Sequence, residues 1–379
     1  MRICSVFPSR IPSETANSIQ AMKASHAMVQ LGHEVITISP GRGPQATTVE
    51  KRWEILARQY GLQKAFRGVY LPPFDNYLAR RIFPWRAAFR ARREHPDLIY
   101  TWLIQTAVMS LLFGLPVVLE LHDIPAGRFG RLWCRLFIWL PGQKRQLVIT
   151  QTLVSALEKD YQHALPETYI APNGVDLDRY NGLPFPVQAR KALGLPAMPT
   201  VACTGHLYGG RGVELFLDLA KRIPEVHFLW VGGRPGDVQR WQDVTESRGL
   251  ENVSFPGFIP NADLPRYQAA ADILMMPYQQ QVSGSSGEAP VRFFSSMKLS
   301  EYMASNRPII SSDLPVIHEV LDESSAVYCP PDDVDAWEKA MRDLLSSPEK
   351  AASLAANARK QVKAYSWTAR AARVLEGLG

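Results

Sequence analysis

Residues 200 to 213 of this chain read Thr-Val-Ala-Cys-Thr-Gly-His-Leu-Tyr-Gly-Gly-Arg-Gly-Val. The apolar run at 200–204 predicts a strand, the glycines predict a turn, and the apolar spacing after Gly212 predicts a helix from about Val213. Another apolar run follows at 226–231, and units of the same kind continue to Val327. Strands that alternate with helices in this way predict a parallel sheet covered by helices.

The chain before this stretch shows the same alternation. A strand is expected at 2–7 and a helix after it, because Ile19, Met22, His26 and Val29 recur at helical spacing. Further strands are expected at 33–38, 98–101, 116–121 and 147–150. The first half therefore predicts a second sheet of the same kind.

A turn-rich stretch separates the two halves and contains Pro172-Asn-Gly174 and Gly182-Leu-Pro-Phe-Pro186. We therefore expect an α/β protein with two doubly wound Rossmann-like domains that face each other across a cleft. The expected domains are 1–175 and 191–364, with a hinge at 176–190 and a C-terminal helix within 365–379 that crosses back onto the first domain. Because ligands of open α/β sheets bind beyond the carboxyl ends of the strands, the cleft is where a ligand is expected.

The composition is that of a folded protein, since 46% of the 379 residues are hydrophobic and 21% are charged. No apolar run approaches the roughly 18 residues that a membrane-spanning helix needs, so neither a transmembrane anchor nor a signal peptide is expected. The four cysteines are scattered without CxxC spacing, which favours a reducing compartment. These features together predict a cytoplasmic protein.

Positive charge is concentrated in the first half. Residues 1–170 carry 21 basic against 12 acidic side chains, whereas the remainder carries 21 against 24. Segment 78–93 interleaves six arginines with Phe83, Trp85 and Phe89, and segment 128–145 repeats this mixture with Trp133 and Trp139. Two interpretations stay open: a surface that lies peripherally on anionic lipid, or two amphipathic helices with inward aromatics and solvated arginines. Nucleic-acid binding is not expected, because no nucleic-acid motif accompanies the charge.

The first candidate site is the glycine-rich turn after the strand at 200–204. Gly205 and His206 follow the strand directly, and Arg211 stands at the start of the next helix. Backbone amides, a guanidinium and an imidazole at a helix N-terminus can hold a diphosphate. The alternative is an ordinary strand-to-helix turn. Neither a P-loop nor a GxGxxG dinucleotide motif is present.

The second candidate site is the segment Ser295-Ser-Met-Lys-Leu-Ser-Glu-Tyr-Met-Ala304. Ser295 or Ser296 can cap a helix whose first-turn amides face phosphate, and Glu301, deeper in that helix, can accept hydrogen bonds from two ribose hydroxyls. The alternative is that Glu301 is a surface carboxylate paired with Lys298 three residues earlier.

Several segments in a fixed order together resemble the retaining family-four glycosyltransferases of GT-B fold, in a bacterial branch. The resemblance runs from Met1 to the Trp367 tail. The segments that carry it are Pro12-Ser-Glu-Thr-Ala-Asn17, Glu120-Leu-His-Asp123, Ala171-Pro-Asn-Gly-Val-Asp-Leu-Asp-Arg-Tyr180, Gly257-Phe-Ile-Pro260, Lys298–Ala304 and Arg307-Pro-Ile-Ile-Ser-Ser-Asp313.

The resemblance implies a role for each matching residue. Glu301 matches the family glutamate on the donor ribose, Arg211 the phosphate-binding lysine, and His122 a histidine that reaches the transferred sugar. His206 stands where an arginine is common. The remaining implied donor contacts are Asn17 in the N-terminal loop, Gly205, the nucleobase-facing backbone of Phe258 and Ile259, and the helix start Ser295, Ser296, Met297 and Lys298.

Two departures from the family pattern concern the donor sugar and the N-terminal loop. Phe293 occupies the position of a second glutamate, and Glu288 is a candidate to replace it. The loop lacks the family's glycine pair, so Thr15 or Asn17 is expected to supply side-chain hydrogen bonds instead.

The expected activity is transfer of a hexose-type sugar, with retention, from a UDP- or GDP-sugar to a glycan or lipid-linked acceptor in bacterial envelope or exopolysaccharide synthesis. The catalytic set is then His122, Arg211 and Glu301, and stabilising the departing diphosphate is its main task. A catalytically silent nucleotide-sugar binder and a GT-B nucleotide-sugar epimerase are the alternatives.

No metal or other cofactor is expected. A metal-dependent transferase of the GT-A type needs an Asp-x-Asp pair, and the chain contains two, Asp176-Leu-Asp178 and Asp333-Val-Asp335. The first pair lies in the interdomain turn, and the second precedes a helix whose N-terminus favours acidic caps. Both pairs therefore have a structural explanation.

Overall fold

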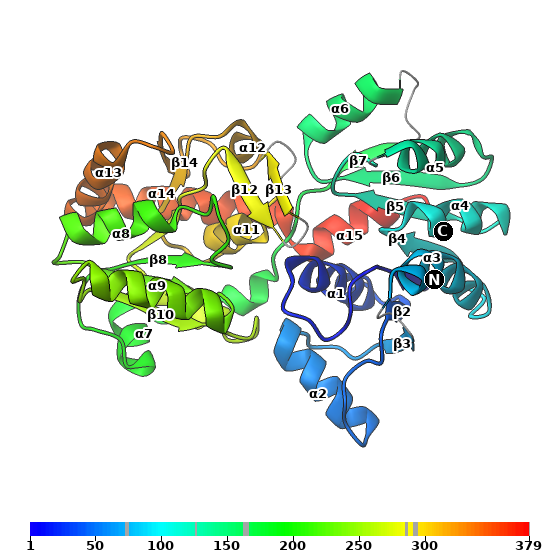
Figure 1. Ribbon diagram of the computed structural model, residues 1–379, viewed down its shortest axis with the longest axis horizontal. Helices are drawn as coiled ribbons and strands as arrows, with labels where there is room; N and C mark the ends of the chain where they lie inside the picture. Colours follow the sequence, from blue (N-terminus) through cyan, green and yellow to red (C-terminus); the bar gives the residue numbers. More distant parts are fainter. Residues whose placement is uncertain (73–75, 126, 162–166, 285–286, 291–294, 379) are drawn as a thin grey trace. The chain divides into compact units, whose positions relative to one another are not determined.

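The computed structural model describes residues 1–72, 76–125, 127–161, 167–284, 287–290 and 295–378 (Figure 1). The chain forms two compact α/β units. The first unit comprises Met1–Asn173 together with Trp367–Gly379, and the second comprises Gly174–Ser366. Each unit has its own parallel sheet with helices on both faces, which confirms the predicted pair of doubly wound domains.

The first unit is built on a seven-stranded sheet of order β3-β2-β1-β4-β5-β6-β7, and every neighbouring pair is parallel. Its strands are β1 (Arg2–Val6), β2 (Glu34–Pro40), β3 (Arg67–Leu71), β4 (Leu98–Thr101), β5 (Val117–Leu121), β6 (Lys144–Val148) and β7 (Thr168–Ile170). The strands at 2–7, 33–38, 98–101 and 116–121 are confirmed. The strand expected at 147–150 begins three residues earlier, and the two edge strands β3 and β7 were not predicted.

The helices of the first unit are α1 (Ala16–Gln30), α2 (Val49–Tyr60), α3 (Tyr77–Arg92), α4 (Ile104–Leu112), α5 (Gly127–Trp139), α6 (Gln151–Tyr161) and α15 (Trp367–Leu375). Helix α1 begins after the N-cap Thr15, whose hydroxyl accepts from the amide of Ser18 at 3.4 Å. It buries Met22 and His26, as their spacing predicts. The C-terminal helix α15 packs against α1, so the end of the chain belongs to the first unit.

The second unit is built on a six-stranded parallel sheet of order β10-β9-β8-β11-β14-β15 and a separate antiparallel hairpin. The strands are β8 (Thr200–Thr204), β9 (His227–Val231), β10 (Val253–Gly257), β11 (Ile273–Met276), β14 (Ile309–Ser312) and β15 (Val327–Cys329), with β12 (Gln281–Gly284) and β13 (Gly287–Pro290) in the hairpin. The strand at 200–204 and the helix start at Val213 are as predicted.

The helices of the second unit cover both faces of this sheet (Figure 1). They are η1 (Leu177–Tyr180), α7 (Pro186–Leu193), α8 (Val213–Arg222), α9 (Pro235–Ser247), α10 (Leu264–Ala269), α11 (Met297–Ala304), α12 (Pro315–His318), α13 (Val334–Ser346), α14 (Pro348–Gln361) and η3 (Val362–Tyr365).

The chain passes from the first unit to the second between Asn173 and Gly174. The 176–190 stretch lies beyond this point, within the second unit, because its side chains are anchored there. Tyr180 is buried and donates its hydroxyl to Oε1 of Gln268 at 2.8 Å, and Arg190 is paired with Asp272 at 2.6 Å.

The strand order of each sheet reverses once, between β1 and β4 in the first unit and between β8 and β11 in the second. At such a switch point the loops after the two central strands run in opposite directions and leave a crevice at the carboxyl edge of the sheet. Each unit therefore offers one natural binding position. In the second unit, the loops that border it follow β8 and β11.

The basic segment 128–145 does not form one surface helix. Helix α5 ends at Trp139, and Lys144 and Arg145 lie in strand β6. Arg145 is buried because it pairs with Glu167 and donates to the carbonyls of Val374 and Glu376. Lys144 donates to the carbonyls at the end of α5. These two cations therefore have structural partners and are not part of a membrane-facing surface.

All four cysteines are buried and free, as the absence of paired spacing suggested. Within the described part of the chain, every helix is either too short or too polar to cross a bilayer.

Candidate functional site

The turn after β8 brings a lysine from helix α11 to the switch point of the second unit. Gly205 has a φ of +124°, and the indole Nε1 of Trp230 donates to its carbonyl at 3.0 Å. A Cβ at Gly205 would lie 3.4 Å from Cε and Nζ of Lys298. The ammonium therefore lies directly against the end of strand β8, and the positive φ of Gly205 is what disfavours a larger residue there.

Two cations meet over one tyrosine at this position. Tyr278 follows strand β11, and its ring centroid lies 4.7 Å from Nζ of Lys298 and 4.8 Å from Cζ of Arg211. Burial alone would raise the pKa of the Tyr278 hydroxyl, but the charges of Lys298 and Arg211 more than offset it, so that the pKa is lowered. Two cations therefore meet at the switch point of the second unit.

Lys298 is buried, with 8% of its surface exposed. Its ammonium lies 3.7 Å from Sγ of Cys203 and over the rings of Tyr278 and Trp230. No carboxylate pairs with it among the side chains that the structure describes. Burying a charge costs several kcal/mol unless the charge is paired, and a bound anion is a partner that fits this position.

Glu301 lies one helical turn after Lys298 in α11, and polar side chains hold its carboxylate. Asn261 Nδ2 lies 3.5 Å from Oε1, and Gln268 Nε2 lies 3.4 Å from Oε2. Gln268 is oriented by Tyr180, which occupies its Oε1. Arg179 in turn donates to Oδ1 of Asn261 at 2.6 Å. Lys298, the alternative partner for Glu301, instead points toward Cys203 and Tyr278.

The other residues with implied donor roles in the second unit follow the strands in the expected order. His206 comes directly after Gly205, and its ring stacks on Tyr208 with centroids 4.9 Å apart. Phe258 and Ile259 follow β10 and are half-buried. Ile259 packs against the hydrophobic core of this unit, so its backbone position is fixed by packing.

Ser296 is the N-cap of α11, and Ser295 precedes it, while Met297 is the first helical residue. The expected side-chain cap is wrong in one respect: Ser296 makes no capping hydrogen bond, and its Oγ lies 3.4 Å from the Tyr278 hydroxyl instead. The helix amides are therefore not covered by this serine. Phe293 and the side chain of Glu288 lie outside the described residues.

The second Asp-x-Asp pair has the capping role that the sequence suggested, while the first lies inside the second unit and not in the crossing itself. Asp333 is the N-cap of α13 and accepts from the amide of Ala336 at 3.0 Å. Asp176 precedes η1 and lies 3.7 Å from Arg179. Among the described residues, no cluster of three His, Cys, Asp or Glu side chains has the spacing to hold a metal ion.

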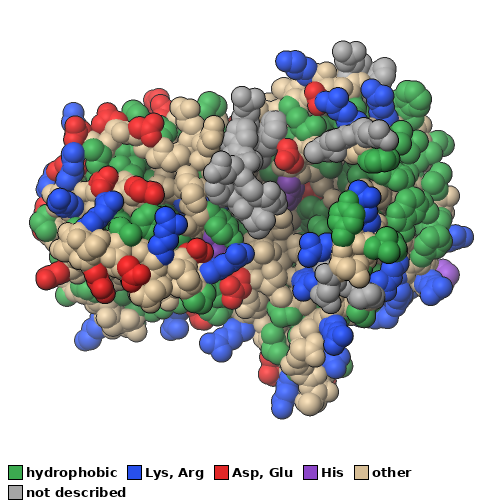
Figure 2. Space-filling view, in the orientation of Figure 1, with side chains coloured by type: hydrophobic (Ala, Val, Ile, Leu, Met, Phe, Trp, Pro, Cys, Tyr) green, Lys and Arg blue, Asp and Glu red, His purple; other side chains and the backbone are tan. Residues whose placement is uncertain are grey.

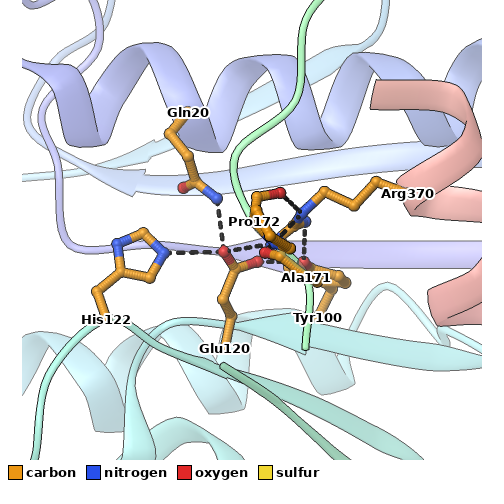
Figure 3. Close-up of polar contacts among 7 residues, drawn as sticks. All are labelled: Gln20, Tyr100, Glu120, His122, Ala171, Pro172 and Arg370. Carbon is orange, nitrogen blue, oxygen red and sulfur yellow. Dashed lines mark hydrogen bonds and ion pairs between the residues drawn. The ribbon is translucent and has the colours of Figure 1, made fainter. Parts of the chain in front are cut away.

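In the first unit, His122 follows strand β5 and is partly exposed. Its Nε2 lies 2.8 Å from Oε1 of Glu120, which is fully buried (Figure 3). Asn17 lies near the start of helix α1 and is exposed. Both side chains lie in loops or helix starts at the carboxyl edge of the first sheet, where the fold places a ligand.

Sequence reasoning missed several residues that shape these sites, and four of them show why. Tyr278 had a signal, since it comes directly after the apolar strand 273–276. Asn261 and Gln268 had none, because each reaches Glu301 across more than thirty residues of sequence. Arg370, which pairs with Glu120 from the last helix, could not be told apart from the other arginines of its segment.

Comparison with protein-family models gives two matches that together span both units. A model described as "Glycosyltransferase Family 4" matches residues 19–179, and a model described as "Glycosyl transferases group 1" matches residues 198–347. The first match falls on the unit with His122, and the second covers Lys298 and Glu301.

Curated relatives are similar over part of their length. The GDP-mannose-dependent alpha-(1-6)-phosphatidylinositol monomannoside mannosyltransferase of Mycolicibacterium smegmatis is 29% identical over 213 residues, which is 54% of each chain. The 2-deoxystreptamine glucosyltransferase of Streptomyces kanamyceticus is 28% identical over 149 residues, 37% of this chain and 38% of that protein. The chain thus spans about half the length, or less, of these relatives.

Solved structures are similar over the whole chain. The crystal structure of Anabaena HepE in complex with UDP and glucose superimposes with a TM-score of 0.72 at 18% identity, covering 100% of this chain and 99% of that one. At this identity the likeness shows the fold alone.

Proposed function

This chain belongs to glycosyltransferase family 4 and has the GT-B fold, and on that premise we propose that it is a metal-independent, retaining hexosyltransferase. Its donor is a UDP- or GDP-sugar, and its acceptor is a glycan or lipid-linked saccharide of bacterial envelope or exopolysaccharide synthesis. The observation that carries the proposal is Lys298, a buried ammonium that shares the ring of Tyr278 with Arg211 and has no carboxylate partner among the described side chains.

A nucleoside diphosphate complements the two cations of this site. Its two phosphates place negative charge beside Lys298 and Arg211, and hydrogen bonds between ionised groups are about twice as strong as neutral ones. Glu301, three residues after Lys298 on the same helix, accepts hydrogen bonds from the ribose hydroxyls. Asn261 and Gln268 hold that carboxylate from behind.

In the proposed reaction the bond between the anomeric carbon and the diphosphate oxygen breaks, and the leaving diphosphate gains negative charge. Arg211 and Lys298 stabilise that charge as it develops. Such electrostatic stabilisation is usually the largest single contribution to the rate of a reaction of this kind. The acceptor hydroxyl forms the new bond on the face from which the phosphate departs, and its proton passes to a phosphate oxygen. His122, which the family resemblance assigns to the transferred sugar, orients it.

The proposal is tested first by donor binding. Thermal unfolding is measured with UDP, GDP and their common hexose conjugates, and one nucleotide series is expected to raise the Tm. A ligand at about 100 times its Kd stabilises the fold by about 2.7 kcal/mol. Glu301→Gln keeps the shape of the side chain but removes its charge, and is expected to weaken donor binding roughly 10- to 100-fold.

Glu246→Gln is the matched control, because Glu246 is an exposed glutamate on α9 of the same unit. It is expected to bind donor as the wild type does. Donor turnover with retained anomeric configuration, lost in Glu301→Gln, supports the transferase. Binding without turnover identifies a silent binder, interconversion of donor sugars identifies an epimerase, and failure to bind either nucleotide series overturns the proposal.

We further propose that the enzyme works on an anionic membrane surface through helices α3, α4 and α5. These three consecutive helices pack side by side and contain no Asp or Glu. They carry most of the large hydrophobic side chains that the described residues leave exposed, namely Tyr77, Leu78, Ile82, Phe89, Leu112, Phe129, Leu132 and Trp139. We call these eight side chains the α3–α5 face.

Exposed arginines lie among the apolar side chains of the α3–α5 face, and Figure 2 shows hydrophobic and basic side chains close together in this region. Arg80, Arg81 and Arg92 are exposed on α3, and Arg131 and Arg135 on α5. On α3 the exposed residues Leu78, Ile82 and Phe89 are spaced by four and seven positions, which places them on one side of the helix. On α5 the spacings between Phe129, Leu132 and Trp139 are three and seven, with the same result. Arg131 also lies 3.9 Å from Asp160 of the neighbouring helix α6. Apolar groups surrounded mainly by cations suit the interface of an anionic bilayer.

Part of the alternative interpretation also holds, because Phe83 is buried and Trp85 packs edge-on against Trp133 at 5.4 Å. The membrane proposal therefore rests on the α3–α5 face and not on these inward aromatics. It is tested by flotation with anionic vesicles. Phe129→Ser removes an aromatic that is 60% exposed on this face, whereas Phe185→Ser removes one that is 74% exposed on the second unit.

A phenylalanine side chain has roughly 200 Å² of surface, of which 60% is exposed for Phe129, so about 120 Å² can be buried by the membrane. At about 25 cal/mol per Å², full insertion is worth about 3 kcal/mol and half insertion about 1.5 kcal/mol. Phe129→Ser is therefore expected to weaken vesicle binding at least tenfold, and Phe185→Ser to leave it unchanged. Equal effects of the two substitutions, or no vesicle binding by the wild type at low salt, would exclude the membrane surface.

A further inference from the structure

A buried carboxylate beside His122 gathers donors from four separate elements of the first unit (Figure 3). Oε1 of Glu120 lies 2.6 Å from Nε2 of Gln20, 2.8 Å from Nε2 of His122 and 2.7 Å from Nη2 of Arg370. Tyr100 donates its hydroxyl to Oε2. Glu120 and Arg370 are both almost completely buried, so this pair is shielded from solvent.

This carboxylate is ionised in the folded protein. Burial alone would raise the pKa of Glu120, but the charge of Arg370 and the hydrogen bonds from His122 and Tyr100 more than offset it and lower the pKa to about 2. A carboxylate has no proton to donate. The hydrogen bond between Glu120 and His122 must therefore run from the imidazole Nε2–H to the carboxylate.

That direction fixes both the tautomer and the rotation of the ring. A neutral imidazole with its proton on Nε2 has an acceptor lone pair on Nδ1. Nδ1 lies on the side of the ring turned away from Glu120 (Figure 3). The structure gives Nδ1 no partner among the residues that it describes, and this nitrogen remains available to a ligand.

We propose that Glu120 is a positioning residue for His122, and that Arg370 and Tyr100 hold it in place, so that His122 meets the substrate through Nδ1 as a hydrogen-bond acceptor. This inference rests on the proposed function, which gives His122 its contact with the transferred sugar. Glu120 itself is buried beneath the histidine and acts only through it.

Arg370 extends the arrangement to the C-terminal helix. Besides Glu120 it donates to the carbonyls of Ala171 and Pro172, next to the point where the chain leaves the first unit. Helix α15 also packs on α1, the helix that carries Gln20. The last helix of the chain therefore influences the tautomer of His122 through the charge of Arg370, which holds Glu120, in addition to packing on α1.

The tautomer can be measured without substrate and without activity. Protein labelled with ¹⁵N-histidine is studied by long-range ¹⁵N–¹H correlation at a pH where His122 is neutral, and His122→Gln identifies the signals of His122. The wild type is expected to show the Nε2–H tautomer. Glu120→Gln, whose amide can donate as well as accept, is expected to lose that preference. A Nδ1–H tautomer in the wild type would overturn the inference.

The kinetic test is a double-mutant cycle on donor turnover. Because a misplaced group at an active site costs up to about 100-fold, Glu120→Gln is expected to lower kcat roughly 10- to 100-fold. Donor KM is expected to change much less, because the nucleotide is bound by the second unit. If Glu120 acts through His122, adding Glu120→Gln to His122→Gln has no further effect.

Additive losses in the cycle would mean that Glu120 acts independently of His122 and would refute the positioning role. If Glu120→Gln does not fold, Tyr100→Phe replaces it as the test variant, because it removes only one hydrogen bond to Glu120. Tyr100→Phe is expected to lower kcat as well, but by less than Glu120→Gln. Glu54→Gln on α2 is the control, because Glu54 is exposed in the same unit. If the wild type turns over no donor, the proposed function fails while the tautomer measurement still decides the inference.

Discussion

Replacing Lys298 with methionine is expected to leave the donor-free protein as stable as the wild type or more stable, and to weaken donor binding roughly 10- to 100-fold. The ammonium is 8% exposed and lies against Cys203, Tyr278 and Trp230, with no carboxylate partner among the side chains described. Methionine is similar in length and apolar, so Lys298→Met removes a buried charge without leaving a cavity. Exchange of a whole buried ion pair for apolar side chains is often neutral or stabilising by about 1–4 kcal/mol, and the exchange of Lys298 is comparable because no described carboxylate is left behind.

The gain in stability is smaller than the desolvation cost of a lysine alone suggests, because two cation–π contacts already offset part of that cost. The rings of Tyr278 and Trp230 already attract the ammonium, and each such contact contributes roughly 0.5–2 kcal/mol. The net change expected in the empty protein is therefore between zero and about 2 kcal/mol of added stability. For donor binding no such compensation exists, since loss of a charge-assisted phosphate contact costs about 1.5–3 kcal/mol, or roughly 10- to 100-fold in Kd.

The assay is thermal unfolding with and without the preferred nucleotide, and Arg190→Met is the matched control. Arg190 is buried to a similar degree but pairs with Asp272 at 2.6 Å, so its removal leaves a carboxylate without its cation. Arg190→Met is expected to lower the Tm and to retain the nucleotide-induced shift. If Lys298→Met destabilises the empty protein as Arg190→Met does, or retains the nucleotide shift, the reasoning about an unpaired ammonium is wrong.

Three further outcomes are expected from other parts of the site. Tyr278→Leu removes the ring shared by two cations and is expected to weaken donor binding about tenfold in calorimetry, whereas Tyr278→Phe keeps the ring and changes it little. Donor turnover is expected to persist in EDTA; complete loss of activity with rescue by manganese would contradict this. Because the pKa of Glu120 is lowered from 4.5 to about 2, its charge stabilises the fold above pH 4.5, and this contribution, on the order of 3 kcal/mol, is lost as the pH falls toward 2. Urea unfolding across that range is expected to show a smaller loss for Glu120→Gln than for the wild type, and equal losses would contradict the ionised state.

Elements set by local pattern were predictable from sequence. Strand β8 and the start of α8 match their predicted positions, because an apolar run followed by glycines leaves few other conformations for the backbone. Strands β3 and β7 were missed since they lie at the sheet edges and are only half-buried, which leaves weak apolar periodicity. Strand β6 begins at a lysine and an arginine, and these two residues look like a polar surface until their partners are known.

The candidate sites divide in the same way. Gly205, Arg211, Lys298 and Glu301 stand next to strand ends or helix starts, where sequence alone indicates a ligand position. The neutralising partners of the buried cations are not local: Arg145 reaches Glu167 and the carbonyls at 374 and 376, and other pairs span eighty residues or more. A single sequence carries no signal for such pairs, so it cannot separate a cation that folds the protein from one that binds a ligand.

The two places where the chain passes between the units are each fixed close to the crossing. On the side of the second unit, Val175 pairs with Ser366 and its amide donates to the carbonyl of Tyr365 at 3.0 Å. On the side of the first unit, Arg370 holds the carbonyls of Ala171 and Pro172. The residues on either side of each crossing are thus hydrogen-bonded within their own unit. Only 173–174 at the first crossing and 367–369 at the second lie between these fixed residues. Arg370 is thus bound at once to the chain next to one crossing and to the carboxylate beneath His122, so a single side chain joins the two.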